Sequence, residues 1–523
     1  MKKLLSLYVL LTIHLAVTAQ FKTIAESPEF NEDEEGYAKV LQLTNGNTIY
    51  LHFSIRHGIN VQMYDAAYKQ ISKKDIEPSY GKLRGGDFDG IFETKGDVTV
   101  LLSERTDRHP ILRRLTFDGK NGGLKKEEVL VDLDERKFRG KRYSNGSSSD
   151  FFLVKDPSSA CFAVITEKND PGLEIIHYGE DNNIVSRADL PDFQGDEIYF
   201  SPKDFVVMGD QRIYLLGYQA ATSTKDKDRK TEMLLATLEK GSNSFQITRL
   251  KFPKDEIIEG GLIKYNSVKN ELIMLQAVER KVEKRYHTVT FQSTYDLAKK
   301  EVSAAKEISL AKADEKSREL FGKKNNYEGI PQNVYFKPDG SYYILFEENE
   351  VEWLTDSKGR TRGTLTTLGD LAAIHYDPQG KETGCWMMPK RVIIPEVKFG
   401  LFYHKLREHT AEWMENANQF KFFNFLSSPA QDYILINDRG ENGDPENRKV
   451  SAMRSVSGCS AYFYKLGGKA TIPERDLFFN AAGDDKEKNL GIFIIADYQA
   501  AKNSYVTIKT TKGKSRLVWM KPE

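Results

Sequence analysis

A strand–turn–strand unit recurs along the chain, and this repetition constrains the fold more than any other feature. Each copy has a short apolar strand, a break rich in Gly, Asp, Asn or Pro, and a second strand rich in aromatic residues. Clear copies are 151–154 before 161–165, 205–208 before 212–216, and 334–336 before 342–346. Repetition of a unit of roughly 50 residues predicts a modular β-fold, and a propeller fits it best.

Eight copies of the unit can be counted, with irregular spacing. Their second strands are expected to begin near Thr48, Val98, Cys161, Arg212, Leu272, Tyr342, Tyr433 and Gly491. Their first strands are expected at 38–43, 88–94, 151–154, 205–208, 262–265, 334–336, 420–425 and 477–480. Two stacked sandwiches are the alternative, but the same four-strand order repeats, which favours a propeller. We therefore predict an all-β propeller of seven or eight blades, each with about four antiparallel strands and the first strand innermost.

Two segments interrupt the strand pattern. Residues 309–330 have a helix-forming composition and are expected to cover the edge of a blade. Residues 396–418 predict a short helical insertion, because apolar side chains recur there with nearly helical spacing opposite charged ones. The apolar stripe consists of Phe399, Phe402, Leu406, Trp413, Ala417 and Phe420. A helix packed on the blades, with Trp413 buried, is favoured over a lid or a helix that docks a partner.

The first 19 residues have the pattern of a secretory signal peptide. A charged start precedes a short apolar run, and Val17 and Ala19 occupy the small-residue positions before a cut. A membrane anchor is the alternative, but the run is interrupted by polar residues and falls short of the ~20 residues that a spanning helix needs. We expect residues 20–523 to form a single propeller domain in the periplasm or outside the cell, with no membrane span.

Basic and acidic side chains are nearly balanced. Without the predicted signal peptide, 74 Lys and Arg residues face 76 Asp and Glu residues. A near-neutral chain gives no electrostatic case for binding nucleic acid or an anionic membrane. The basic stretch at 137–142 is interpreted as a solvated loop.

The three cysteines leave room for one disulfide at most. Cys161 lies in an alternating strand and is interpreted as a small buried hydrophobic residue. Cys385 and Cys459 lie near the starts of strands in neighbouring units, so a bridge between them remains open, although free thiols are favoured.

Familiar catalytic motifs are absent from the sequence: no nucleophile elbow, P-loop or H-E-x-x-H occurs. His52 and His57 have no partner at a metal-ligand spacing. His404 and His409 are five residues apart, a spacing that places them on different faces of a helix. We interpret these histidines as structural or surface residues.

Asp87 and Asp89 are the best candidates for an inward-facing pair of carboxylates, because they flank an expected innermost strand. Glycosidases need two carboxyl groups at a defined separation. Aspartates that bind local backbone groups in a turn are the favoured interpretation of the same pair.

The loop at 437–447 is the richest in Asp, Asn and Gly, and it supplies a candidate calcium site at Asp438, Asn442 and Asp444. Calcium takes oxygen ligands from closely spaced carboxylates, amides and backbone carbonyls around a sharp turn. The loop departs from the usual calcium-loop template, since Gly440 occupies a ligand position. A hairpin loop is therefore favoured over a calcium site, and no other cofactor is expected.

Residues 434–447 place an Asn-Asp…Asn segment after an apolar strand, with Trp386 upstream and Gln20 directly after the expected signal cut. In these features the chain resembles secreted propeller-like proteins of Bacteroidota with no assigned activity. The resemblance implies a propeller fold and export, and it transfers no catalytic residue.

Repetition without a catalytic signature predicts a non-enzymatic binding or scaffolding propeller of the cell envelope, with an envelope protein or a glycan as partner. The alternative is a polysaccharide hydrolase or lyase that uses carboxylates in the central funnel. An enzyme should show acids and aromatic residues at one mouth of the channel. A scaffold should show a plugged channel and a broad exposed apolar patch.

Overall fold

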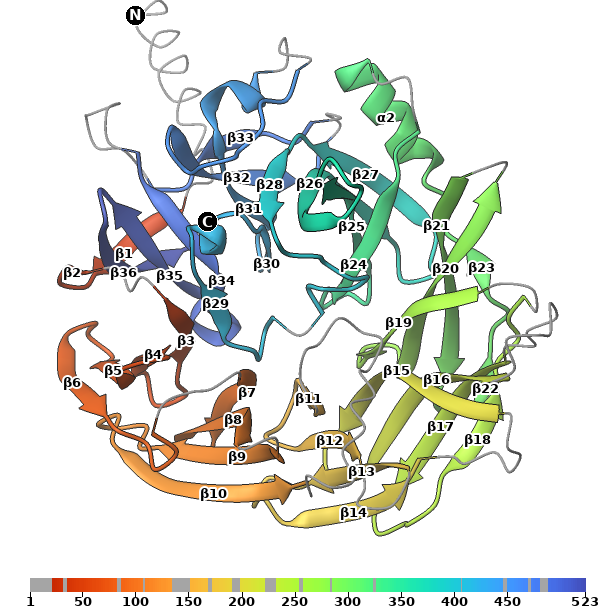
Figure 1. The fold of residues 1–523 in the computed structure, drawn as a ribbon, viewed down its shortest axis with the longest axis horizontal. Helices are drawn as coiled ribbons and strands as arrows, with labels where there is room; N and C mark the ends of the chain where they lie inside the picture. Colours follow the sequence, from red (N-terminus) through yellow and green to blue (C-terminus); the bar gives the residue numbers. More distant parts are fainter. Residues whose placement is uncertain are drawn as a thin grey trace, which may run out of the picture.

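Eight antiparallel sheets surround a central axis in the computed structural model (Figure 1). The structure describes residues 21–31, 35–81, 86–106, 109–133, 151–167, 172–190, 198–221, 232–253, 257–282, 285–322, 326–405, 407–444, 449–468, 472–479 and 488–523. The chain is therefore an eight-bladed β-propeller, which confirms the predicted fold class and decides between seven blades and eight.

The first four blades follow one another along the chain. Blade 1 contains β3 (Gly36–Gln42), β4 (Thr48–Ser54), β5 (Gly58–Tyr64), β6 (Gln70–Ile76) and, beside β3, β29 (Glu412–Met414). Blade 2 contains β7 (Asp87–Thr94), β8 (Asp97–Thr106), β9 (His109–Phe117) and β10 (Leu124–Asp132). Blade 3 contains β11 (Phe152–Lys155), β12 (Phe162–Glu167), β13 (Leu173–Tyr178) and β14 (Ile184–Asp189). Blade 4 contains β15 (Ile198–Met208), β16 (Arg212–Ala221), β17 (Glu232–Glu239) and β18 (Gln246–Arg249).

The remaining four blades complete the ring. Blade 5 contains β19 (Ile257–Asn266), β20 (Glu271–Val282), β21 (Arg285–Asp296), β22 (Glu301–Val302) and β23 (Lys306–Glu307). Blade 6 contains β24 (Gly329–Phe336), β25 (Tyr342–Thr355), β26 (Thr361–Tyr376), β27 (Glu382–Met388) and β28 (Val392–Pro395). Blade 7 contains β30 (Asn424–Ser427), β31 (Asp432–Arg439), β32 (Cys459–Leu466) and β33 (Arg475–Leu477). Blade 8 contains β34 (Leu490–Gln499), β35 (Ser504–Thr511), β36 (Lys514–Lys521), β1 (Lys22–Glu26) and β2 (Phe30–Asn31).

The first strand is the innermost in seven blades, as predicted, whereas in blade 1 the short strand β29 pairs with the inner edge of β3. Neighbouring first strands such as β15 and β19 contact one another. Seven of the expected first strands overlap or adjoin an observed one. The eighth is wrong: Leu477 belongs to β33, the outer strand of blade 7, and the innermost strand of blade 8 is β34. The number of units was correct, but the strand assignment failed here because the last blade takes its outer strands, β1 and β2, from the other end of the chain.

Closure of the ring depends on β1, which pairs antiparallel with β36. Phe21, just before β1, is 1% exposed. Its ring centroid lies 4.7 Å from that of Tyr433 and 4.5 Å from that of Phe478, both of which belong to the blade 7 region. The N-terminal segment thus joins the last two blades through backbone pairing and through aromatic packing.

The helix predicted within 309–330 is confirmed as α2 (Ala311–Phe321), which contacts β27. The helix predicted at 396–418 is wrong. This segment forms turns, the short strand β29 and a 3₁₀ turn η1 (Asn418–Phe420). Phe402 and Ala417 have positive φ angles of 58° and 59°, which no right-handed helix accommodates. Backbone pairing of β29 with β3 and buried contacts around the channel replace the bonds that a helix would have made.

Two further 3₁₀ turns, η2 (Gly440–Gly443) and η3 (Ala500–Lys502), lie in connections. All three cysteines are buried and free, so the open Cys385–Cys459 bridge does not form; the two residues lie on β27 and β32 of different blades. Over the part of the chain that the structure describes, no helix is long and apolar enough to cross a membrane.

Candidate functional sites

Residues 399–405 and 407–411 cross the central axis, and we call this segment the plug (Figure 1). Its backbone bonds to three blades. Phe402 N donates to Pro331 O at 3.0 Å, and Ile91 N donates to His409 O at 2.6 Å. The ammonium group of Lys39, on β3, donates to Arg407 O at 2.8 Å. The plug is therefore held from blades 1, 2 and 6.

A buried ion pair also holds the plug. Lys405 Nζ lies 3.1 Å from Asp204 Oδ1, and both side chains are less than a tenth exposed. The second oxygen of Asp204 accepts a hydrogen bond of 2.9 Å from Ile263 N. Burial lowers the pKa of Lys405, and the nearby Asp204 carboxylate opposes this effect. One carboxylate thus connects the plug with β15 and β19.

Behind the plug lies a cavity of about 850 Å³. Residues in or just after the second halves of innermost strands line this cavity; examples are Leu43, Phe92 and Tyr335. Ala38 and Pro331, in the first halves of their strands, contact the plug or its flank instead. Innermost strands of a propeller all run the same way along the axis. The plug therefore forms the floor of a channel that is closed at one end. His404, Arg407, Glu408 and His409 of the plug line it.

Most described carboxylates around the channel already have a donor. Asp497 Oδ2 accepts a hydrogen bond from Gln42 N at 2.8 Å, and Glu93 accepts one from Thr44 N at 2.8 Å. Glu412 lies 3.5 Å from Arg407 Nε. The channel thus offers few carboxylates that are not already engaged for an acid–base pair of the glycosidase kind.

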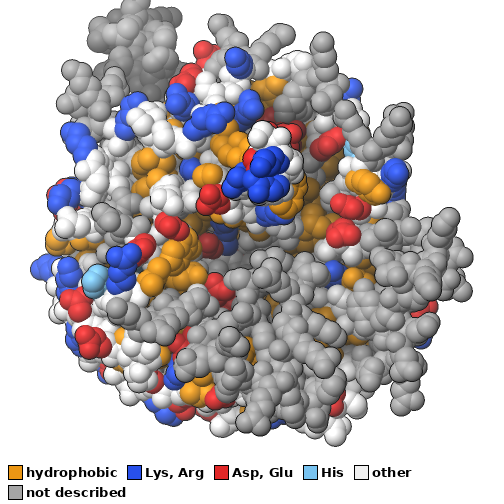
Figure 2. All heavy atoms as spheres, in the orientation of Figure 1, with side chains coloured by type: hydrophobic (Ala, Val, Ile, Leu, Met, Phe, Trp, Pro, Cys, Tyr) orange, Lys and Arg blue, Asp and Glu red, His pale blue; other side chains and the backbone are white. Residues whose placement is uncertain are grey.

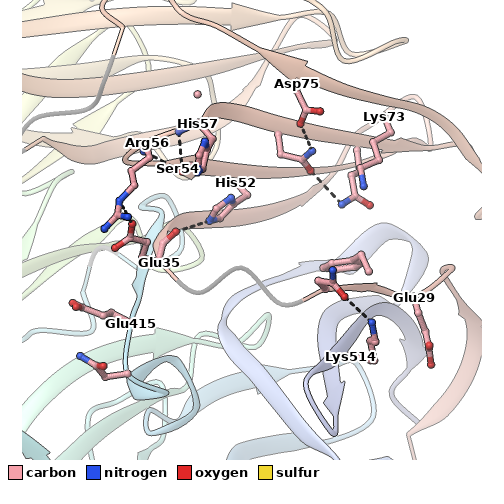
Figure 3. A pocket seen from close by; sticks show the side chains of 16 residues that line it. Glu29, Glu35, His52, Ser54, Arg56, His57, Lys73, Asp75, Glu415 and Lys514 are labelled. Atoms are coloured by element: carbon pink, nitrogen blue, oxygen red, sulfur yellow. Dashed lines mark hydrogen bonds and ion pairs between the residues drawn. The ribbon is translucent and has the colours of Figure 1, made fainter.

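A second cavity, of about 950 Å³, is a surface cleft between blades 1 and 8 (Figure 3). Polar side chains dominate its walls. The lining residues are Glu29, Phe30, Asn31, Glu35, His52, Ser54, Arg56, His57, Gly58, Asn60, Gln62, Lys73, Asp75, Glu415, Asn416 and Lys514.

A chain of hydrogen bonds orients the amides on the blade 1 wall of the cleft. Asn60 Nδ2 donates to Asp75 Oδ1 at 2.7 Å, and Gln62 Nε2 donates to Asn60 Oδ1 at 3.3 Å. Tyr64 OH, which is buried, donates to Gln62 Oε1 at 2.8 Å. The core therefore fixes which amide groups face the cleft.

The other walls are organised by ion pairs and by a histidine. Arg56 Nε lies 2.9 Å from Glu35 Oε1, and His52 Nε2 lies 3.1 Å from Glu35 O. From blade 8, Lys514 Nζ donates to Asn31 Oδ1 at 2.6 Å. The cleft thus contains cationic, anionic and amide groups within one groove.

Asp87 and Asp89, the predicted carboxylate pair, lie at the start of β7 and are half-buried. Asp87 Oδ1 accepts a hydrogen bond of 2.9 Å from Tyr37 OH, and burial together with Asp87 raises the pKa of Tyr37. Neither aspartate lines the two cavities described above.

The predicted calcium loop brings Asp438 and Asn442 together and leaves Asp444 exposed. Asn442 Nδ2 donates to Asp438 Oδ1 at 2.7 Å, and Asn442 Oδ1 accepts from Ser451 N at 2.7 Å. Arg475 Nη2 lies 3.4 Å from Asp438 Oδ2, so a bound cation would face a guanidinium group. Calcium binding stays a prediction, which melting curves with calcium and with a chelator would test.

Several residues of the two cavities escaped sequence reasoning. His52 and His57 were interpreted as structural or surface residues, yet both line the cleft. Lys155 and Lys264 line the channel cavity. Like Lys39, which contacts the plug, they lie on innermost strands next to apolar residues, and this recurring lysine was a signal that the sequence contained.

The described surface shows charges of both signs interspersed, a hollow near the centre and hydrophobic side chains in separate groups (Figure 2). Large exposed hydrophobic residues are spread over seven blades; they are Ile24, Ile71, Val129, Ile184, Ile247, Val268, Tyr286, Trp353 and Leu354. The plugged channel expected of a scaffold is present, whereas the large exposed hydrophobic residues among those described come from seven different blades.

Comparison with protein-family models and with curated proteins finds no match. Among solved structures, the chain is similar to an ulvan lyase of polysaccharide lyase family PL25, at 8% identity and a TM-score of 0.37 over 84% of this chain and 96% of that one. It is also similar to polysaccharide lyase Uly1, at 8% identity and a TM-score of 0.36 over 86% and 93% of the two chains. The WD40 domain of SCAP from fission yeast matches at 8% identity and a TM-score of 0.34 over 95% and 98%. Likeness at this level carries no argument about function.

Proposed function

We propose that this protein is an exported, non-enzymatic binding propeller of the cell envelope, and that the cleft between blades 1 and 8 holds a glycan. The observation that carries the proposal is the hydrogen-bonded series Asp75–Asn60–Gln62, which presents fixed polar groups in a groove of about 950 Å³. Export rests on the signal-peptide pattern of the first 19 residues.

Glycans suit this cleft for a chemical reason. Sugar hydroxyl groups both donate and accept hydrogen bonds, and amide and carboxylate side chains supply the matching acceptors and donors. Binding sites gain specificity from a small number of polar groups held in place before the ligand arrives. Asn60 is held by Asp75, and Lys514 is held by Asn31, so these two residues form opposite preorganised walls.

A glycan array followed by calorimetric titration of the bound glycan tests the proposal. We expect Asn60→Ala and Lys514→Ala each to weaken binding about 5-fold or more, since a hydrogen bond contributes about 1 kcal/mol. Gln211→Ala, in an exposed turn of blade 4, is the matched control and should bind like the wild type. Melting curves of all variants exclude unfolding as the cause.

Two outcomes would contradict the proposal: an array with no bound glycan, or a bound glycan whose affinity the cleft variants leave unchanged. The bound glycan should also be incubated with the protein and analysed for cleavage. New chain ends would replace the binding role with the alternative of a polysaccharide hydrolase or lyase that uses the central funnel.

A further inference from the structure

The closed end of the central channel gathers cationic side chains from separate parts of the chain. Lys39, Lys155 and Lys264 come from β3, β11 and β19, and Arg407 comes from the plug. Lys264 Nζ lies 3.5 Å from Lys405 O, and Lys155 Nζ lies 2.5 Å from Asp156 O. The lysines therefore donate in part to backbone carbonyl groups, and the carboxylates of Asp156 and Glu408 also act on Lys155.

Two polar atoms of the floor have no hydrogen-bond partner among the described residues. They are Arg407 Nη1 and His404 Nε2, both buried, and both residues line the cavity. The His404 side chain is 3% exposed, and its ring lies 3.9 Å from that of Phe423, which fixes the ring in place. A buried donor without a partner costs free energy, so such groups in native proteins point to an absent ligand or to water.

We propose that the floor of the central channel is a binding site for an oxyanion, a carboxylate or sulfate group, with Lys155, Lys264 and Arg407 as its cationic contacts and His404 as a neutral donor. The size of the cavity, about 850 Å³, accommodates a small organic molecule that carries such a group. This site is separate from the cleft and stands whether or not the cleft binds a glycan.

The pKa values of His404 and His409 reflect the cationic side chains near the channel floor. Burial, together with the three lysines on the innermost strands, keeps the pKa of His409 well below its usual value. Burial, together with Arg407 and Lys390, keeps the pKa of His404 well below its usual value too. Both imidazoles are therefore neutral at pH 7, and both lie where an anion would be stabilised.

Four carboxylates line this cavity: Glu93, Glu180, Glu408 and Asp497. Glu412 is paired with Arg407, and Asp497 accepts a backbone hydrogen bond. Glu408, exposed in the cavity wall, is the carboxylate that competes directly with a bound anion for Lys39 and Lys155. Neutralising Glu408 should therefore strengthen anion binding, an effect that a purely structural role of these charges does not produce.

Calorimetric titration of the full mature protein at constant ionic strength tests the site. The probes are inorganic sulfate, acetate, a uronate disaccharide and a neutral disaccharide. We expect saturable binding of at least one anionic probe and none of the neutral one at this site. Tighter binding of the uronate than of free acetate or sulfate would identify a sugar-borne anion, and the reverse order a small free anion.

Variants decide whether the channel floor is responsible. Lys264→Met should weaken binding at least 5-fold, and Glu408→Gln should strengthen it about 3-fold. Lys126→Met, at an exposed lysine of β10 outside both cavities, is the matched control and should leave affinity unchanged. Glu408 is exposed, so its variant is expected to fold even if Lys264→Met does not. Absence of saturable binding by every anionic probe, or equal effects of Lys126→Met and Glu408→Gln, would overturn the proposal.

Discussion

Lys405 of the plug and Asp204 of β15 form an ion pair of 3.1 Å, with both side chains less than a tenth exposed. The pair matters because it joins the plug to β15, and its two residues are 201 positions apart in the sequence. This ion pair favours the observed conformation of the segment over the helix that its sequence pattern predicts. Burying the ammonium group of Lys405 costs free energy. The carboxylate of Asp204 offsets this cost only in the observed position of the plug, where the two groups meet.

Loss of this pair should destabilise the fold strongly. We expect Asp204→Ala to lower the free energy of unfolding by about 3–5 kcal/mol, because the ammonium group of Lys405 would stay buried without a partner. Urea denaturation measures the change. Asp210→Ala removes the exposed pair of Asp210 with Lys240, and it should lower the free energy of unfolding far less, because solvent screens exposed ion pairs. Similar losses in the two variants would contradict the structural role of the plug.

Closure of the ring by the N-terminal segment gives a second prediction. Phe21→Ala should cost about 3–5 kcal/mol, because it opens a cavity among aromatic rings of the last two blades. Ile24→Ala alters the same segment at a side chain that is 42% exposed, and it should change stability by about 0.5 kcal/mol or less. Equal melting temperatures of the wild type and Phe21→Ala would show that Phe21 does not secure the closure.

Asp438 should make stability depend on pH. Burial raises its pKa to about 6, whereas an unfolded aspartate titrates near about 3.9. The folded state therefore keeps this proton longer, and the stability from this group falls as pH rises from about 4 to 6. Asp438→Asn cannot ionise, so its stability relative to the wild type should increase by about 2–3 kcal/mol between pH 4 and pH 7.

Chemical denaturation of both proteins across this pH range measures the difference directly. A stability difference that stays constant with pH would mean that Asp438 does not titrate in the window, for instance because Arg475 keeps it ionised.

Two aromatic residues of the 396–418 segment should differ in importance. Phe402 is 2% exposed, and Phe402→Ala should cost about 3–5 kcal/mol. Trp413 is only half-buried; its ring contacts Tyr37 at 4.8 Å, and its Nε1 donates to Glu415 at 2.8 Å. Trp413→Ala should cost about 1–2 kcal/mol, since one aromatic pair contributes about 0.5–1.5 kcal/mol beyond its buried area. Thermal melts of the two variants test the order, and a larger loss for Trp413→Ala would reverse it.

The sequence by itself determined the blades. Alternation in 48–55 and the aromatic second strand at 342–346 are local patterns, and each specifies a strand because successive side chains point to opposite faces. Helix α2 followed from composition in the same way. Local patterns repeat, so the sequence predicted seven or eight blades, and the structure has eight.

Only the tertiary structure decided where the ring closes and what fills its centre. The partner of β36 is β1, which lies almost the whole chain away. No pattern in residues 477–480 shows that they follow the end of blade 7 and do not begin blade 8. The plug shows the same limit, because Lys405 meets Asp204 across about 200 residues of sequence, a contact that helical periodicity does not encode. The cleft likewise joins Asn60 with Lys514 from opposite ends of the chain. Strands depend on neighbours in sequence, whereas sites depend on neighbours in space, and here the closed ring creates those neighbours.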